Sequence, residues 1–228
     1  MHCILEQTDH SSSASLLLEQ GDPQAIFAHM LDPLIAWVGN DPSEWIEACE
    51  SAQRIVVPCG RQESDGDEHA ASLLASWSQA GWAQFDENVL QLDQQMNEAK
   101  IELMIRPSSS GMLSDAICTM AWARRSEDLG CSLMLDPIGW IVESMLRDVS
   151  DHLSRINDLC VGCEKIGAVM IRSVRHDQAG VLVESSIGEG EIDSAIIADR
   201  LGGLIRWAID AGKPIVVHND ADLKLLGL

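Results

Sequence analysis

The sequence IGAVMIRSVRHDQAGVLVESSIGEGEID, residues 166–193, contains an apolar run, a polar loop and a glycine-bracketed acidic turn. Apolar residues and one glycine fill positions 166–171, which predicts a buried β-strand that ends where the charged residues begin. After the turn, apolar residues recur at helical spacing, and Asp193 is a typical helix N-cap. A strand, a loop and a helix in this order form one unit of a repeating β/α architecture.

The same alternation recurs along the chain. Further apolar runs occupy residues 55–57, 101–105, 131–135 and 215–217, and stretches with helical periodicity separate them. The runs are almost continuously apolar, as expected for parallel strands that are covered on both faces. No Gly-x-Gly-x-x-Gly follows any of them, which disfavours a dinucleotide-binding sheet. We therefore predict an α/β fold of the TIM-type (β/α) barrel kind.

Helices are predicted between these runs. One helix is expected to end at Gly81, and a second one covers residues 87–99. After Asp136 and Pro137, apolar residues at helical spacing over 141–156 predict a long amphipathic helix. Each helix would return the chain to the start of the next parallel strand.

The charge and the N-terminus limit the classes of partner. The net charge is −21, with 36 acidic residues against 15 basic ones, so the surface repels phosphate backbones and a nucleic-acid partner is not expected. No run of about 18 uncharged apolar residues exists, so we expect no membrane span. Residues 2–5 are too short for a signal peptide, and Glu6 and Asp9 follow them. We expect a cytoplasmic protein.

Seven cysteines are scattered along the chain, without the density of a disulfide scaffold. Cys160 and Cys163 form a C-x-x-C pair, but a zinc site would need a second pair or two histidines nearby. A redox pair would normally open a helix after a strand, and this pair lies before a strand, so a structural role is favoured. Cys59 ends a predicted strand and could be a nucleophile beside His218, although a lone buried cysteine is more often inert.

Polar residues at the strand ends occur in the triplets Ile105-Arg106-Pro107, Leu135-Asp136-Pro137, Ile171-Arg172-Ser173 and Val217-His218-Asn219. In a β/α barrel, residues at these ends carry the chemistry. Together with the turn at 188–193, this order of motifs resembles the sugar phosphate isomerase/epimerase family, the xylose-isomerase-like TIM barrels. The resemblance covers residues 54–228. The turn matches the family's Gly-x-Gly-x-x-Asp pattern, and Asp136 matches an aspartate that ends a strand.

The resemblance also implies a divalent-metal site of carboxylates and histidines, and here the sequence departs from the family. Arg106 replaces a glutamate, Arg172 replaces a histidine, and His218 replaces the final glutamate. Gly139 and Trp140 stand where a further histidine would follow Asp136. Two arginines would repel a divalent cation and offer forked donors to an anion instead. We therefore expect no metal ligands and no cofactor.

The N-terminal quarter is irregular. Residues 2–5 predict a short strand, whereas the apolar residues within 26–31 follow helical spacing. The five clear strands resemble the fourth to the eighth of a barrel, and residues 1–53 are too few for three further β/α units. We therefore expect a single domain, residues 1–228, whose barrel is incomplete or truncated at the N-terminus. An open edge of the β-sheet would need to be covered by a helix or by a partner.

The strand ends allow two interpretations of the site. In the first, Arg106 and Arg172 hold a phosphate or carboxylate group, and Asp136 or His218 exchanges protons. In the second, the arginines pair with Asp136 to neutralise buried charge, because charged groups are rarely buried unpaired. Arg175 lies in the loop after its strand and could close over an anion.

Trp140 lies just past a strand end and is a candidate for stacking on a sugar. The resemblance implies a divergent sugar phosphate isomerase/epimerase-like barrel that lacks the usual metal chemistry and binds a small anionic or sugar ligand. The alternative is an active isomerase or epimerase on a sugar or sugar phosphate, with Asp136 or His218 as base and arginines as electrophiles. We expect a small sugar or phosphosugar as partner, and a homo-oligomer is left open.

Overall fold

The computed structural model describes residues 2–6, 14–19, 25–30, 53–61 and 74–228. Eight strands form a closed barrel: β1 (His2–Glu6), β2 (Ala14–Glu19), β3 (Ala25–Met30), β4 (Arg54–Pro58), β5 (Glu102–Arg106), β6 (Ser132–Leu135), β7 (Ile166–Met170) and β10 (Ile215–Val217). Their order around the barrel is β1–β10–β7–β6–β5–β4–β3–β2, which closes on itself. The predicted TIM-type barrel is confirmed.

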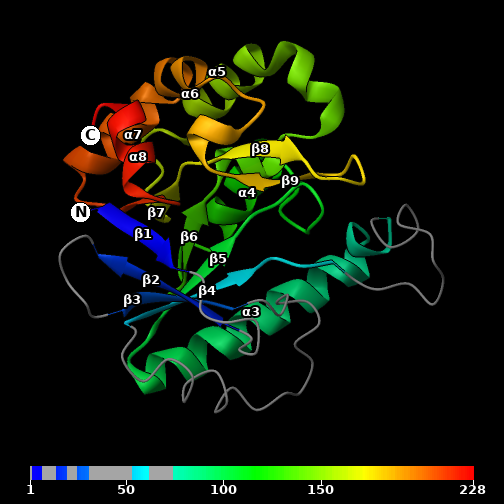
Figure 1. Cartoon of the computed structure of the whole chain (residues 1–228). Coiled ribbons are helices and arrows are strands. Elements are labelled where there is room, and N and C mark those ends of the chain that lie inside the picture. The colour runs from blue at the N-terminus through cyan, green and yellow to red at the C-terminus, as the bar shows by residue number, and fades with distance from the viewer. Residues whose placement is uncertain (1, 7–13, 20–24, 31–52, 62–73) are drawn as a thin grey trace.

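The N-terminal part of the barrel differs from regular β/α units. Strand β2 runs antiparallel to both β1 and β3, whereas the other neighbouring strands are parallel. Three strands therefore come from residues 2–30, and they close the sheet next to β4 (Figure 1). The strand predicted at 2–5 is confirmed by β1. The expected open edge does not occur, because β1 pairs with β10.

The helical spacing predicted over 26–31 is wrong, because β3 is a strand. It pairs with β2 on one side and with β4 on the other. A segment this short is a marginal helix by itself, whereas pairing on two sides satisfies its backbone groups. The predictions that fall on residues 31–52 lie outside the described part of the chain.

In the described part of the chain, the α-helices labelled in Figure 1 are α3 (Gln79–Ala99), α4 (Ala116–Arg125), α5 (Val149–Cys160), α6 (Ser194–Arg200), α7 (Gly202–Asp210) and α8 (Asp220–Leu226). Gly81 does not end a helix as predicted but lies in the first turn of α3. There its backbone N–H donates to the side chain of the cap residue Ser78 at 3.1 Å. None of the described helices is both long and apolar enough to cross a membrane.

The predicted long helix after Pro137 is shorter than expected. Two 3₁₀ helices, η2 (Pro137–Trp140) and η3 (Glu143–Asp148), precede α5. The chain is extended at Val142, with φ −109° and ψ 164°, which interrupts the helical backbone. The tight turn at η2 is closed by Asp136, whose side chain caps it, and this fixes Asp136 at the rim of the barrel.

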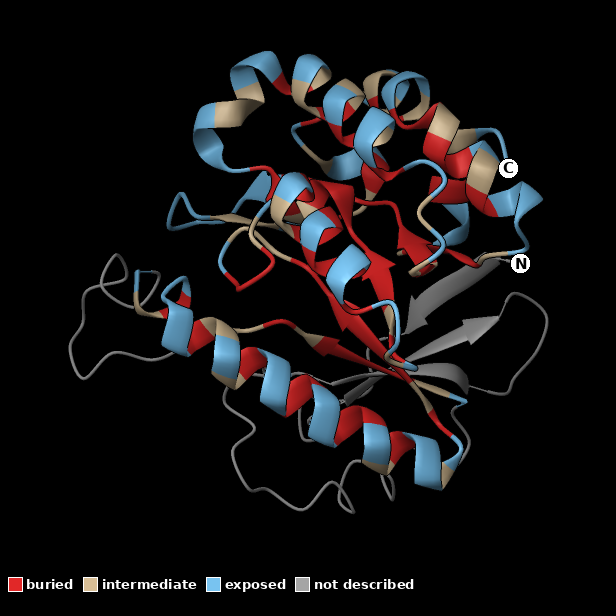
Figure 2. Cartoon of the chain, turned by 180° about the vertical axis from the view of Figure 1, so that it is seen from behind, coloured by how far each residue is buried: buried red, intermediate tan, exposed pale blue. Residues whose placement is uncertain are grey.

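Two layers of apolar side chains explain the continuous apolar strands. One cluster fills the barrel interior and consists of Val56, Met104, Met134, Ala168, Met170 and Val216. Alternate residues of the same strands, such as Ile55, Val57 and Leu103, belong to the larger core that packs against the helices. Figure 2 shows these strands as buried and the outer faces of the helices as exposed.

A β-hairpin that the sequence analysis did not predict follows β7. Its strands are β8 (Ser173–His176) and β9 (Leu182–Ser185), which pair only with each other and stand outside the barrel (Figure 1). The turn is closed by Asp177, whose Oδ1 accepts hydrogen bonds from Ala179 and Val181 at 2.8 Å each. Because it follows the C-terminal end of β7, the hairpin projects from the rim where the candidate site residues lie.

Candidate functional site

Three of the candidate residues meet at the C-terminal ends of neighbouring strands. Arg106 is the last residue of β5, Asp136 follows β6, and Arg172 follows β7. In parallel strands these ends lie on the same rim of a barrel. All three residues are buried, with Asp136 at 0%, Arg172 at 5% and Arg106 at 9% exposure. The sequence-based expectation that they lie on one face therefore agrees with the geometry.

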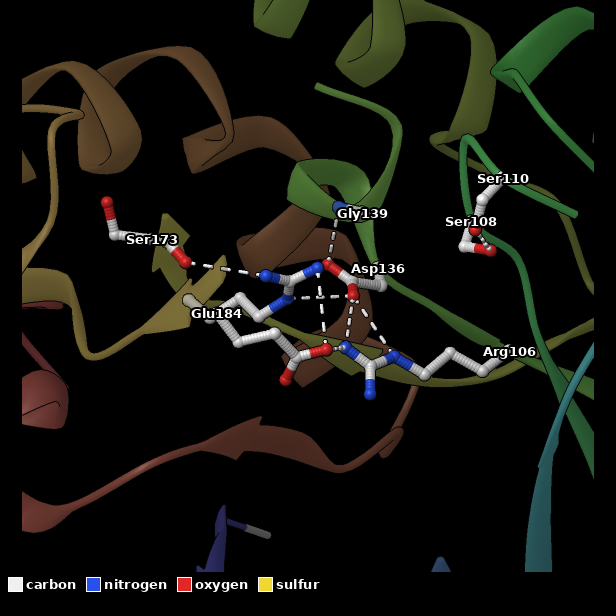
Figure 3. Close-up of polar contacts among 8 residues, drawn as sticks. Arg106, Ser108, Ser110, Asp136, Gly139, Ser173 and Glu184 are labelled. Carbon is white, nitrogen blue, oxygen red and sulfur yellow. Dashed lines mark hydrogen bonds and ion pairs between the residues drawn. The ribbon is translucent and has the colours of Figure 1, made fainter. Parts of the chain in front are cut away.

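Asp136 is held by four hydrogen bonds. Its Oδ2 accepts from Arg106 Nη2 at 2.6 Å and Nε at 3.1 Å, and from Arg172 Nε at 2.8 Å. Its Oδ1 accepts from the backbone N–H of Gly139 at 2.9 Å (Figure 3). Burial by itself would raise the pKa of Asp136, but the charges of Arg172 and Arg106 outweigh it, and the pKa lies below its usual value. Asp136 is thus a fixed carboxylate whose two oxygens are both occupied.

Glu184, from the hairpin strand β9, is the fourth member of this group and was missed by the sequence analysis. Its Oε1 accepts from Arg106 Nη2 at 2.5 Å and lies 3.7 Å from Arg172 Nη2. Burial would raise the pKa of Glu184, yet the two arginines hold it below its usual value. We call Arg106, Asp136, Arg172 and Glu184 the ion-pair cluster (Figure 3).

Next to the cluster lies a pocket of about 440 Å³, which we call the His218 pocket. It is lined by Arg175, Glu184, Ser185, Ser186, Glu189, His218 and Asn219. The Nε2 atom of His218 is buried and has no hydrogen-bond partner in the described part of the chain. Burial lowers the pKa of His218, so the imidazole is neutral at pH 7. His218 thus contributes a neutral imidazole to the pocket wall, and its buried Nε2 is a polar atom that the described residues leave unsatisfied.

Arg175 belongs to the same pocket. It lies on β8 and is exposed, unlike the two arginines of the cluster. Within the described residues, no ion pair involves its guanidinium. The pocket therefore combines a cation available to a ligand with a neutral imidazole and carboxylate acceptors.

Two other candidates lie elsewhere. Trp140 is 3% exposed, donates from Nε1 to the backbone oxygen of Leu113 at 3.0 Å, and lines a separate apolar pocket of about 410 Å³ beside α4 and α5. It therefore does not join the His218 pocket. Cys59 is fully buried among the chain around Ser108 and Met112, and burial raises its pKa, so its thiol is not activated.

The chain matches no family model, and no curated protein matches its sequence. Its structure is similar to that of the probable 3-DHS dehydratase AsbF from Bacillus anthracis, with a TM-score of 0.53 and 11% identity over 90% of this chain and 74% of AsbF. A second similar structure is a xylose isomerase-like TIM barrel protein from Mycobacterium smegmatis in complex with magnesium. It gives a TM-score of 0.47 and 14% identity over 80% of this chain and 63% of that one.

The chain has the fold of a TIM-type barrel, as its closed eight-stranded sheet and its similarity to AsbF show. The predicted resemblance is thereby confirmed for the fold. At 11% and 14% identity the similarity concerns the fold alone, so the activities of these neighbours are not transferred to this barrel.

The ion-pair cluster of this barrel does not fit a divalent metal ion. Arg106 and Arg172 place two cations at the strand ends, and both oxygens of Asp136 already accept hydrogen bonds. Among the residues that the structure describes, no three His, Cys, Asp or Glu side chains are grouped to hold a metal. Hard divalent ions need several oxygen or imidazole ligands together. The donor set of the rim is suited to anions rather than to cations.

Proposed function

We propose that this chain is a xylose isomerase-like barrel protein that works without the divalent-metal chemistry of such barrels and binds a small sugar or phosphosugar in the His218 pocket. The observation that carries the proposal is the ion-pair cluster, in which two buried arginines occupy strand ends where the resemblance implies metal ligands. A positive charge at these positions opposes a divalent cation by several kcal/mol at short range.

The lining of the pocket supports a polyhydroxylated ligand. A sugar hydroxyl both donates and accepts hydrogen bonds. The pocket offers Glu184 and Glu189 as acceptors, and His218 lines it with a neutral imidazole. Arg175 is placed to pair with a phosphate or carboxylate of the same ligand, because a guanidinium binds these groups through two parallel N–H donors.

The test is a thermal-shift panel of neutral aldoses and ketoses, their phosphates, and inorganic phosphate. We expect at least one phosphosugar to raise the melting temperature of the wild type, and Arg175→Ala to reduce that rise. Arg200→Ala, which removes an exposed arginine on helix α6, should leave the rise unchanged. A wild type that responds to no sugar or phosphosugar would contradict the proposal.

A second candidate function is an isomerase or epimerase, and the state of His218 favours it. A neutral imidazole that lines the pocket can take a proton from a carbon next to a carbonyl, through the ring nitrogen that carries no hydrogen, and return it to the neighbouring carbon or to the opposite face. Asp136 is a poorer base, because both of its oxygens are engaged and its pKa is lowered. Uptake of deuterium from D₂O into a sugar, lost in His218→Asn, would support this function.

The cytoplasmic location, the absence of a nucleic-acid partner and the oligomeric state stay predictions from the sequence. The metal-free character is the part of the proposal on which both candidate functions agree. Metal content therefore tests it irrespective of the ligand.

A further inference from the structure

The members of the ion-pair cluster differ in origin and exposure. Arg106, Asp136 and Arg172 come from the ends of barrel strands, and their side chains are 11%, 1% and 6% exposed. Glu184 comes from the hairpin outside the barrel, and its side chain is 44% exposed. The three barrel residues together carry one net positive charge, and Glu184 brings the cluster to neutrality.

We propose that Glu184 fills an anion-binding site formed by Arg106 and Arg172, and that a phosphate group displaces it. The two guanidinium groups share Asp136 and both turn a nitrogen toward Oε1 of Glu184. A single carboxylate oxygen meets one of them at 2.5 Å and the other at only 3.7 Å. A phosphate, with three acceptor oxygens, can satisfy both arginines at once.

The position of Glu184 makes the exchange feasible. It forms part of the wall of the 440 Å³ His218 pocket, so its side chain has space to rotate away from the arginines. Its strand pairs only with β8, and the barrel ladder does not depend on it. Displacement would leave the carboxylate of Glu184 in the His218 pocket, where solvent can reach it.

This inference deepens the proposed function, because it adds Arg106 and Arg172 to Arg175 as partners of the phosphate of a phosphosugar, and its probe is inorganic phosphate alone. Isothermal titration at constant ionic strength compares wild type, Glu184→Gln and Glu189→Gln. Glu189 lines the same pocket but forms no ion pair with Arg106 or Arg172 among the described residues, so it controls for a general loss of negative charge.

We expect Glu184→Gln to bind phosphate about tenfold or more tightly than the wild type, which corresponds to about 1.4 kcal/mol. Glu189→Gln should bind like the wild type. Equal affinities for Glu184→Gln and wild type, or an equal gain in Glu189→Gln, would overturn the inference. If Glu184→Gln folds only when phosphate is present, that result supports the inference by itself.

Where Glu184→Gln does not fold at all, Glu184→Asp replaces it in the titration. The aspartate keeps the negative charge, but its side chain is one methylene shorter and holds the carboxylate farther from Arg106 and Arg172. We expect this variant to bind phosphate more tightly than the wild type does. An unchanged affinity would count against the site. If the wild type binds a sugar through Arg175 but the Glu184 variants gain no affinity for phosphate, this inference is overturned and the proposed function is not. If Glu184→Gln binds phosphate tightly but no sugar or phosphosugar raises the melting temperature of the wild type, the proposed sugar ligand is overturned and this inference is not.

Discussion

Arg172 and Asp136 form a buried ion pair between the ends of two neighbouring barrel strands, with Nε 2.8 Å from Oδ2 and side chains that are 6% and 1% exposed. The pair connects the ends of β7 and β6 at the rim. Arg106, at the end of β5, pairs with the same carboxylate. The cluster thus connects the ends of three strands and ties the hairpin to them through Glu184.

Removing one partner of this pair should destabilise the fold strongly. Arg172→Met leaves Asp136 with one arginine instead of two, and breaking a buried pair typically costs about 3–5 kcal/mol. Because Arg106 still pairs with Asp136, we expect the free energy of unfolding to fall by an amount near the lower end of this range. Urea unfolding measures it. The matched control is Arg200→Met, whose exposed pair with Asp199 should contribute less than about 1 kcal/mol. Equal effects of the two substitutions would contradict the role of the cluster.

His176 should make the hairpin sensitive to pH. Its Nε2 lies 2.6 Å from Glu143 and its Nδ1 lies 3.1 Å from Glu191, and hydrogen bonds to Glu191 and Glu143 raise its pKa above 6.5. A raised histidine pKa stabilises the folded state below pH 6.5, and that stabilisation is lost as the pH rises through the folded pKa. We expect hairpin amides to exchange with solvent faster above that pKa, after correction for the intrinsic rate. His176→Gln should remove the pH dependence.

His218 should behave in the opposite way. Burial lowers its pKa below 6.5, so the folded state disfavours the charged form. Stability should therefore fall as the pH drops below 6.5 toward the folded pKa, because the unfolded chain binds the proton more readily. The imidazole resonance of His218 in NMR titration gives the midpoint. A midpoint at or above 6.5 would contradict a buried, neutral base.

The second glycine of the acidic turn should tolerate no side chain. A Cβ at Gly190 would lie 2.0 Å from Oγ and 2.3 Å from Cβ of Ser173, which begins the hairpin. Gly190→Ala must push turn and hairpin apart, and we expect a loss of about 1–3 kcal/mol in the free energy of unfolding. At Gly188 the nearest atom is the flexible end of Leu225 at 3.2 Å, so Gly188→Ala should cost clearly less. A reversed order would show that the contact with Ser173 does not constrain the turn.

The sequence predicts the barrel well where both faces of a strand are apolar. In β4, Val56 belongs to the interior cluster while Ile55 and Val57 pack toward the helices, so the run contains no polar residue. Strand β3 was predicted as helical, because a short apolar run has no distinctive period and its pairing partners determine its conformation.

The candidate site is predictable where it depends on strand ends and not where it depends on the hairpin. Arg106 contacts Glu184 across 78 positions of sequence, and no local pattern indicates that contact. The turn from Asp177 to Gly180, between segments that both contain β-branched residues, is the feature that could have indicated the hairpin. Trp140 follows a strand end but is carried into the core by the 3₁₀ turn at η2, a direction that spacing alone does not give.

We propose that the ion-pair cluster stands in place of a divalent-metal site at the rim of this barrel. The most direct test is the metal content of the chain purified without chelator, measured again after incubation with Mn²⁺, Mg²⁺ or Zn²⁺ and gel filtration. We expect far less than one metal ion per chain in each case and an unchanged melting temperature after a chelator is added. One tightly bound divalent ion per chain that is lost in Asp136→Asn would contradict it.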